Sequence, residues 1–335
     1  MKAWRFYKMK KFLSLFLTVV IVVASLSGCS FAKTAGSRSN DTIQIVTTIF
    51  PEYDWVENIL GENPANAEFT MLLDNGVDLH SYQPTADDIL TISTCDLFVY
   101  VGGESDAWVE EVLQNAANDN MVVINLLDTL GDKVKEEELV EGMEPEDEEA
   151  EEEEEEPEYD EHVWLSLRNA SVLCDSIAEA MGAIDEDHAE EYRDNAAAYK
   201  EKLSALDAQY QAAVSGASVT TLLFGDRFPF RYMVDDYDLD YYAAFVGCSA
   251  ETEASFETIT FLAEKVDELS LPSVMVIEGT DHRIAETIIE NTRTKDQQIL
   301  TLDSMQGTAS GDIQNGATYL SIMENNLVVL KEALK

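Results

Sequence analysis

The chain alternates strand-like and helix-like segments in two blocks, and this pattern limits the fold more than any other feature. In the first block, apolar runs at 43–50, 69–73, 97–101 and 122–126 predict strands, and the segments 53–60, 86–93 and 106–118 predict helices. In the second block, strands are predicted at 219–224, 273–277 and 299–302, and helices at 256–268, 283–292 and 318–334. Strands that alternate with helices indicate mostly parallel sheets with helices on both faces, and hence an α/β fold.

One long helix separates the two blocks. Its apolar positions recur at alternating steps of four and three, the spacing of one stripe on a continuous helix: Tyr192, Ala196, Tyr199, Leu203, Leu206 and Tyr210. A helix from about 187 to 214, closed by Gly216, would span roughly 40 Å at a rise of about 1.5 Å per residue. Two interpretations are open, a peripheral packing helix and a rigid strut between two lobes.

The first 41 residues are set aside from the fold because they have the features of a targeting segment and a tether. Five basic residues precede an apolar stretch at 12–24, which is shorter than the about 20 residues that a membrane span needs. The stretch ends in Leu26-Ser27-Gly28-Cys29, which resembles a bacterial lipoprotein cleavage box. We therefore predict a signal peptide at 1–28, lipid modification of Cys29 and a flexible tether at 29–41, which would hold an exported protein at the outer face of the cell membrane. The alternative is an ordinary secretory signal with an incidental cysteine.

The charge balance excludes nucleic acid as a partner. The net charge is −45, and removal of residues 1–28 would remove five positive charges and no negative ones, giving −50. A surface this acidic repels nucleic acid and anionic lipid and attracts cations. At 144–161, 14 of the 18 residues are acidic and none is basic, so this tract cannot form a packed core. We expect an acidic loop at 136–161.

The remaining cysteines and the lack of catalytic motifs narrow the function further. Cys95, Cys174 and Cys248 form no CxxC pair and are odd in number, so we expect buried thiols that behave as apolar side chains, with one disulfide as the alternative. The sequence contains no G-x-S-x-G elbow, no P-loop and no H-E-x-x-H motif, so we predict that the protein is not an enzyme. A zinc-dependent hydrolase is the less favoured alternative, since a metal site with an open position can support one.

Two of the four histidines stand in motifs that predict metal binding. His80 lies in the segment 76–85 (GVDLHSYQPT) and His162 in the segment 160–165 (DEHVWL), each where a loop meets the start of a predicted helix. An imidazole held at such a position can point its free nitrogen into a cleft. His188 begins the long helix among acidic residues and is expected to be solvated, and His282 is a weaker candidate in a loop after a strand.

These motifs resemble those of the zinc- and manganese-binding solute-receptor lipoproteins of bacterial ABC importers. The resemblance runs from about residue 43 to the C-terminus and rests on 46–51 (VTTIFP), 76–85, 160–165, 302–305 (LDSM) and the stripe of the long helix. It implies two α/β lobes of mostly parallel sheet flanked by helices, joined by one long backbone helix, with the metal in the cleft between the lobes. The domains would be a first lobe at 42–186, the backbone helix at 187–216 and a second lobe at 217–335.

The resemblance also implies ligands and a function. His80 and His162 match the two histidines of the first lobe, and Asp303 matches a carboxylate near the end of the chain. Imidazole with carboxylate oxygen suits Zn²⁺ or Mn²⁺; the imidazoles and the acidic tract favour zinc, whereas Asp303-Ser304 looks more like manganese members. The implied function is a monomeric receptor that captures Zn²⁺, alternatively Mn²⁺, and delivers it to an ABC permease. A surface adhesin of the same fold is the alternative.

The third ligand position departs from the family. A His or Glu is usual on the strand that opens the second lobe, and this position matches Arg227, which has no lone pair to offer a metal. Asp226 is the alternative ligand, although alternation along a strand would point it away from the side that Arg227 faces. Otherwise water completes the shell, or Arg227 pairs with an acid such as Glu278.

Overall fold

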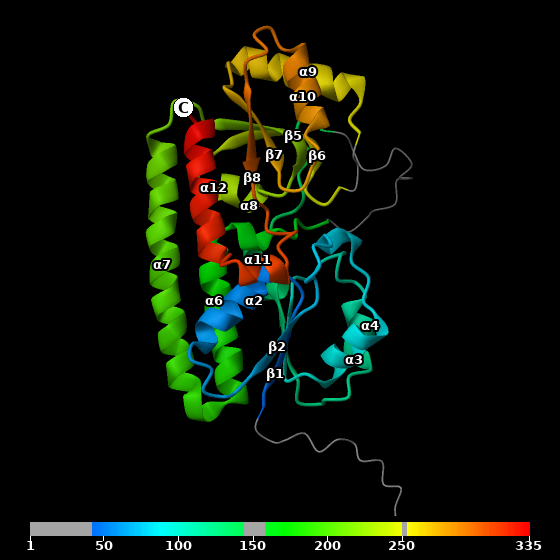
Figure 1. Cartoon of the computed structure of the whole chain (residues 1–335), viewed down its shortest axis with the longest axis vertical. Helices are drawn as coiled ribbons and strands as arrows, with labels where there is room; N and C mark the ends of the chain where they lie inside the picture. The colour runs from blue at the N-terminus through cyan, green and yellow to red at the C-terminus, as the bar shows by residue number, and fades with distance from the viewer. Residues whose placement is uncertain (1–41, 144–157, 250–252) are drawn as a thin grey trace, which may run out of the picture. The chain divides into compact units, whose positions relative to one another are not determined.

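Two parallel β-sheets lie at the centre of the structure, a computed structural model in which residues 42–143, 158–249 and 253–335 are described. The first sheet has the order β2-β1-β3-β4 and consists of β1 (Gln44–Thr47), β2 (Glu68–Met71), β3 (Leu97–Tyr100) and β4 (Val122–Asn125). The second has the order β6-β5-β7-β8 and consists of β5 (Thr221–Phe228), β6 (Asp240–Val246), β7 (Ser273–Ile277) and β8 (Gln298–Leu302). Every strand pair is parallel, so the predicted α/β fold is confirmed (Figure 1).

Helices connect and cover the strands of the first sheet. They are α2 (Phe50–Leu60), α3 (Ala86–Thr94), α4 (Val109–Gln114), α5 (Leu126–Leu130) and α6 (Leu167–Ile184). Helix α2 carries Pro51 in its first turn. Backbone N–H groups in the first turn make no hydrogen bond within the helix, so the N–H that proline lacks costs the helix nothing there. Thr85 caps α3, because its hydroxyl accepts the backbone N–H of Asp88 at 3.2 Å.

Five further helices follow β5 along the chain. They are α8 (Arg231–Asp236), α9 (Phe256–Leu269), α10 (Arg283–Asn291), α11 (Ser310–Gln314) and α12 (Tyr319–Ala333). Strand β5 packs directly on α10 at Gly225, where a Cβ atom would lie 2.6 Å from the Cα of Ala285. The missing side chain at Gly225 therefore sets the close approach of β5 to α10.

The long predicted helix is α7 (Ala189–Ser215), which ends at Gly216 and buries all six residues of its apolar stripe. Near its start, Asn195 Nδ2 donates to the carbonyl of Ile59 at 3.0 Å and the Tyr199 hydroxyl donates to Asp54 Oδ2 at 2.9 Å, both in α2. Near its end, the Tyr210 hydroxyl donates to a carbonyl of α12, a helix that packs against β8. Helix α7 is therefore fastened to helices beside both sheets, which favours the strut over the peripheral packing helix (Figure 1).

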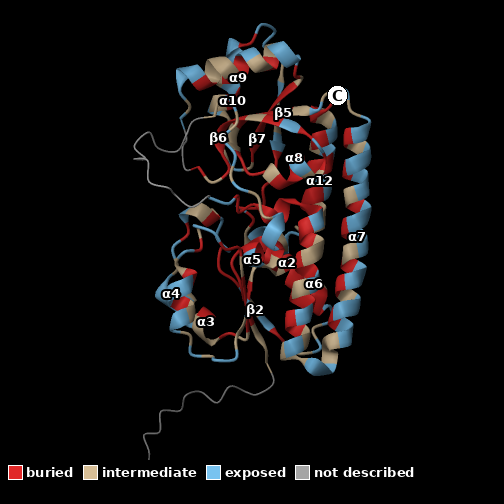
Figure 2. Cartoon of the chain, turned by 180° about the vertical axis from the view of Figure 1, so that it is seen from behind, coloured by how far each residue is buried: buried red, intermediate tan, exposed pale blue. Residues whose placement is uncertain are grey.

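One apolar core continues from the first sheet to the second. A single cluster of buried side chains includes Val46 and Phe98 of the first sheet, Trp164, and Phe224 and Leu302 of the second sheet. Figure 2 shows buried residues along the strands and exposed residues along the outer faces of the helices. Because separation of the two sheets would expose this shared core, we expect movements between them to be small.

Several predictions for the chain ends and loops fall partly outside the described residues. The predicted signal peptide, Cys29, the tether and residues 144–157 of the acidic loop lie outside them. The two sides of that loop meet where it is described: Glu136 bridges Tyr159, and the Asp160 N–H donates to the carbonyl of Lys135 at 2.9 Å. Within the described ranges, we find no helix with the length and apolarity that a membrane crossing requires.

Asp54, buried between α2 and α7, is expected to make stability depend on pH. Burial raises its pKa to about 6 from an ordinary 3.8, although the donated Tyr199 hydroxyl opposes the shift. Because the pKa of Asp54 is higher in the folded state than in the unfolded state, the protonated side chain stabilises the fold at a pH below the unfolded-state pKa. This stabilisation is lost as pH rises through 6. Relative to the wild type, Asp54→Asn should therefore gain up to about 3 kcal/mol in unfolding free energy between pH 4 and pH 7. Urea denaturation at both pH values measures this, and parallel pH profiles of the two proteins would refute it.

Candidate metal centre

His80 is presented by a short 3₁₀ helix, Leu79–Ser81, that follows β2. Asp78 caps this helix, and its Oδ1 accepts the backbone N–H of His80 at 3.0 Å. The Nδ1 atom of the imidazole lies 2.8 Å from Ser105 Oγ and 3.4 Å from Glu161 Oε2. Because Nδ1 is engaged by the Ser105 hydroxyl, Nε2 is the ring nitrogen available to a ligand.

His162 is fully buried directly before another 3₁₀ helix, Val163–Leu165. Asp160 holds it twice, since its Oδ1 accepts the backbone N–H of His162 at 2.9 Å and lies 3.0 Å from Nδ1. A carboxylate on one ring nitrogen is a common outer partner of metal-binding histidines, because it fixes the ring and makes the other nitrogen a stronger base. His162 thus has the environment of a preorganised ligand.

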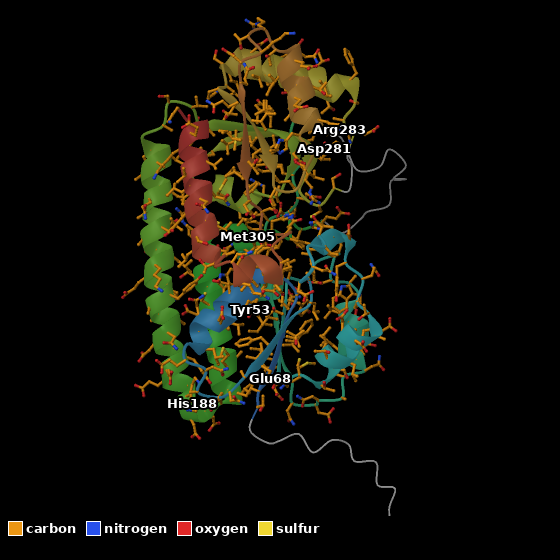
Figure 3. The ribbon with its side chains drawn as sticks, viewed as in Figure 1. Tyr53, Glu68, His188, Asp281, Arg283 and Met305 are labelled. Atoms are coloured by element: carbon orange, nitrogen blue, oxygen red, sulfur yellow. The ribbon has the colours of Figure 1, made fainter. Side chains whose placement is uncertain are left out.

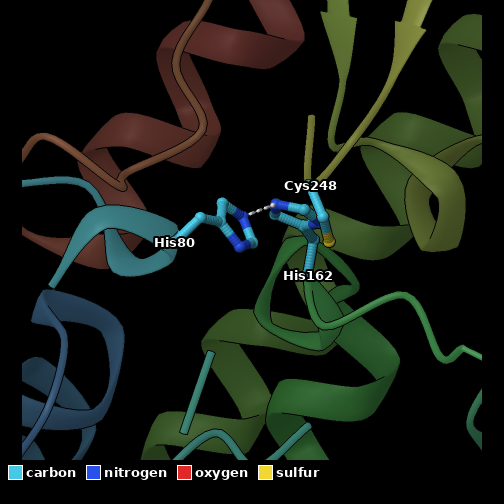
Figure 4. A group of neighbouring side chains, drawn as sticks. All are labelled: His80, His162 and Cys248. Carbon is cyan, nitrogen blue, oxygen red and sulfur yellow. Dashed lines mark hydrogen bonds between the residues drawn. The ribbon is translucent and has the colours of Figure 1, made fainter. Parts of the chain in front are cut away.

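The two imidazoles meet at their Nε2 atoms. Nε2 of His80 lies 3.2 Å from Nε2 of His162 (Figure 4). Two nitrogens bound to one tetrahedral Zn²⁺ at about 2.0–2.1 Å are about 3.4 Å apart, so the pair already has nearly the required separation. Burial, followed by repulsion from His162, lowers the pKa of His80 to about 3. His80 is therefore neutral at neutral pH and can bind a cation without first losing a proton.

Cys248 completes a group of three donors around this point. It follows β6, and one donor atom from each of His80, His162 and Cys248 lies within 4.8 Å of the other two. Over the described ranges of the chain, no other set of three or more His, Cys, Asp or Glu side chains is gathered in this way. Burial, followed by the charges of Asp160 and Glu161, raises the pKa of the Cys248 thiol well above its usual range.

The three described cysteines are all free thiols, and they differ in burial. Cys95 and Cys174 are buried, as predicted, whereas Cys248 is half-buried beside the histidines. The prediction of a buried, apolar-like thiol was therefore wrong for Cys248. Its position depends on β6, which the sequence analysis had not predicted.

Asp303 lies on the loop that follows β8 and stands outside the group of three. Its Oδ1 accepts the backbone N–H of Met305 at 2.8 Å, and burial, followed by the charge of Glu278, raises its pKa to about 6. The same loop reaches the histidines through Gln306, whose side-chain amide lies 2.6 Å from His162 Nε2. Asp303 as a ligand stays a prediction, and Gln306 is a site residue that the sequence analysis missed.

Strand β5 is irregular where the third ligand was expected. Its register with β6 shifts between Phe224 and Arg227. Arg227 forms an ion pair with Asp78, the residue that caps the His80 helix. Although burial opposes it, this pairing lowers the pKa of Asp78. Arg227 therefore links β5 to the first lobe close to the histidines.

Of the alternatives for Arg227, pairing with an acid is confirmed, but the acid is Asp78 and not Glu278, which the sequence analysis named as an example. Glu278 instead accepts the backbone N–H and the hydroxyl of Ser304 at 2.7 and 2.6 Å. Asp226 is also engaged within the second lobe, because its carboxylate accepts the N–H groups of Arg227 and Ile277 at 2.9 and 3.3 Å. Asp226 stands outside the group of three, and its role as a ligand stays a prediction.

Two cavities border these residues. One of about 250 Å³ is lined by His80, Cys248 and four glutamates, namely Glu104, Glu137, Glu158 and Glu161. The other, of about 450 Å³, lies between Asp78 and Ser81 on one side and Asp226, Arg227 and residues 279–284 on the other. The carboxylates of the smaller cavity give a cation a favourable approach to His80.

The other two histidines lie elsewhere. His188 stands at the start of α7 (Figure 3), where its Nδ1 lies 2.6 Å from Asp185 Oδ2. His282 precedes α10 in a left-handed conformation (φ 59°) and lines the larger cavity. Neither belongs to the group of three, in agreement with the prediction that both are weaker candidates than His80 and His162.

Two lobes with parallel sheets, joined by a long helix, are the architecture of two-lobed solute-binding receptors. The family described as "Zinc-uptake complex component A periplasmic" (ZnuA) matches residues 45–333. The chain belongs to this family.

Individual relatives agree with this membership. The zinc-binding lipoprotein AdcA of Streptococcus pneumoniae is 31% identical over 309 residues, which cover 92% of this chain and 58% of AdcA. The high-affinity zinc uptake system protein ZnuA of Bacillus subtilis is 28% identical over 328 residues, which cover 97% of this chain and 98% of ZnuA. The crystal structure of the Zn(II)-bound ZnuA-like domain of S. pneumoniae AdcA matches with a TM-score of 0.68 and 27% identity, covering 88% of this chain and 99% of that domain. The chain spans little more than half the length of AdcA.

Proposed function

We propose that this protein is an extracytoplasmic receptor, held to the cell membrane by a lipid on Cys29, that captures Zn²⁺ between its lobes and delivers it to an ABC permease. The observation that carries the proposal is the meeting of His80 Nε2 and His162 Nε2 at 3.2 Å. Each ring has its Nδ1 atom held by an outer partner, as metal-binding histidines usually do. The relatives named for zinc binding and zinc uptake support zinc as the cargo.

His80 and His162 are the proposed ligands of the first lobe, and Asp303 is the proposed carboxylate ligand of the second. Asp303 lies three residues before Gln306, which reaches His162. A movement of the loop after β8 would bring an oxygen donor toward the two nitrogens. Asp226 is the alternative donor, and would first have to leave its backbone partners.

Capture requires little movement of the lobes. Trp164, next to the first-lobe histidine, donates from its indole nitrogen to the carbonyl of Ser304 at 2.9 Å, and Arg227 pairs with Asp78. These contacts, together with the shared apolar core, hold the two sides of the site close to one another. We propose that a cation enters past the glutamates, binds between preformed ligands and leaves after the receptor docks on the permease. The proposed roles are binding and transfer as a monomer, without catalysis.

A growth assay in the native host tests the transport function. We expect a strain that lacks this protein to grow slowly in medium depleted of zinc by a chelator, because capture of scarce Zn²⁺ is lost. The full chain should restore growth and zinc uptake, and the His162→Ala chain should not. Restoration of growth by manganese but not by zinc would contradict zinc as the cargo. Normal zinc uptake in the strain without the protein would contradict the function itself.

A further inference from the structure

We propose that Cys248 is the third protein ligand of the metal and takes over the place of the ligand that Arg227 cannot provide. The inference rests on the proposed function and deepens it, because it adds a thiolate to the donor set. Figure 4 shows the cysteine beside the two imidazoles. The donor atoms of His80, His162 and Cys248 are mutually within 4.8 Å.

The backbone that leads to Cys248 is built for this close approach. A Cβ atom at Gly247 would lie 2.9 Å from both His162 Cε1 and the carbonyl oxygen of Phe228. A residue with a side chain would therefore push the end of β6 away from the histidine. Gly247 lets the chain pass directly against the His162 ring and places the next residue at the site.

Arg227 holds the same segment from the other side. Its guanidinium pairs with Asp78, two residues from His80, and its Nη1 donates to the carbonyl of Ser249 at 3.5 Å, one residue after Cys248. The residue at the usual ligand position thus connects the first-lobe ligand loop to the segment that carries the thiol. Arg227 acts as a positioning residue, and the donor comes from the neighbouring strand.

A second buried group points to a cation at this place. Glu161 Oε2 is buried without a hydrogen-bond partner in the described part of the chain and lies 3.4 Å from His80 Nδ1. An unpaired buried carboxylate oxygen is costly, and a cation bound on the imidazole would favour its charge. The glutamates of the smaller cavity and Cys248 line the same space.

The geometry and the chemistry of a thiolate suit zinc. Around one tetrahedral Zn²⁺, a sulfur lies about 3.6 Å from each nitrogen, a separation that the present limit of 4.8 Å between the donor atoms approaches. Binding forms a Zn–S bond and releases one proton from the thiol, which passes to water or to a carboxylate of the smaller cavity. Thiolate is a soft ligand that suits Zn²⁺ and is poorly matched to Mn²⁺, so Cys248 would give the site its preference for zinc.

Cobalt absorption tests the inference directly, because a thiolate bound to Co²⁺ produces intense near-ultraviolet absorption that nitrogen and oxygen ligands do not. We compare full chains that all carry Cys29→Ser, so that this thiol does not contribute. The Co²⁺ form should show the thiolate band, and the Cys248→Ser form should lose it. Cys248→Ser should also bind Zn²⁺ at least about tenfold more weakly, with little change in Mn²⁺ affinity.

Thiol labelling gives a second readout that does not depend on a variant. Saturating Zn²⁺ should protect Cys248 from a maleimide, while the buried Cys95 and Cys174 serve as internal controls that react slowly with or without the metal. A Co²⁺ spectrum without a thiolate band, in a chain that loses Zn²⁺ binding on His162→Ala, would overturn the role of Cys248 and leave the proposed function intact. Failure of the chain to bind Zn²⁺ at all would overturn both.

Discussion

Replacing His162 with alanine is expected to weaken Zn²⁺ binding by more than about 100-fold. Loss of an outer hydrogen-bonding partner of a metal ligand costs about 10–100-fold in affinity, and His162→Ala removes the ligand itself. His80→Ala should have an equally large effect, because the two Nε2 atoms face each other at 3.2 Å and neither can hold the ion alone. Competition with a chromophoric zinc chelator at neutral pH measures both affinities.

Two further variants give an intermediate loss of Zn²⁺ affinity and a control without loss. Asp160→Asn leaves the His162 ring in place and weakens its anchor at Nδ1, so it should cost about 10–100-fold. His188→Ala is the matched control, since this imidazole lies at the start of α7 and binds Asp185 instead. Full affinity in either His80→Ala or His162→Ala would show that the ion binds elsewhere.

Replacing Trp164 with alanine is expected to lower the free energy of unfolding by about 3–5 kcal/mol, the usual cost of removing a buried aromatic side chain. Trp164 is fully buried, its ring centroid lies 5.3 Å from that of His162, and its Nε1 donates to the carbonyl of Ser304. The cavity would open between the first-lobe histidine and the loop that carries Asp303. Urea denaturation monitored by circular dichroism measures the loss.

Trp164→Phe separates packing from hydrogen bonding at this position. It keeps an aromatic ring and loses the bond to Ser304, so most of the stability should return, with about 1–2 kcal/mol still missing. The bond from the Tyr319 hydroxyl to the backbone carbonyl of Trp164, at 2.6 Å, does not involve the side chain and can persist in both variants. A loss below about 1 kcal/mol for Trp164→Ala would contradict a central packing role for this residue.

Much of the fold was predictable because its signals are local. All four strands of the first sheet and three of the second were expected close to where they lie, and the apolar stripe gave α7. Helix α6 was missed, although its buried Ala170, Leu173, Ile177 and Met181 follow the helical spacing of three and four. Strand β6 was missed as well, although its apolar run ends at Gly247 as a buried strand often does.

The site was predictable in part. Its first-lobe motifs are local in sequence, whereas the residues that complete it come from distant parts of the chain. His80 and His162 were identified from their flanking residues and from the family resemblance, and the structure brings them together. Cys248 depends on the placement of β6 against His162, which no local pattern encodes. The pairing of Arg227 with Asp78 joins residues 149 positions apart, and no local pattern in the sequence pointed to Asp78 rather than to Glu278.

Native mass spectrometry can show whether the chain binds one Zn²⁺ ion through His162. The full chain is purified without added metal and then given one equivalent each of Zn²⁺ and Mn²⁺. We expect one Zn²⁺ ion per wild-type chain, no retained Mn²⁺, and no retained metal in the His162→Ala chain. A wild-type chain that retains Mn²⁺ in preference to Zn²⁺, or a His162→Ala chain that retains zinc as the wild type does, would contradict it.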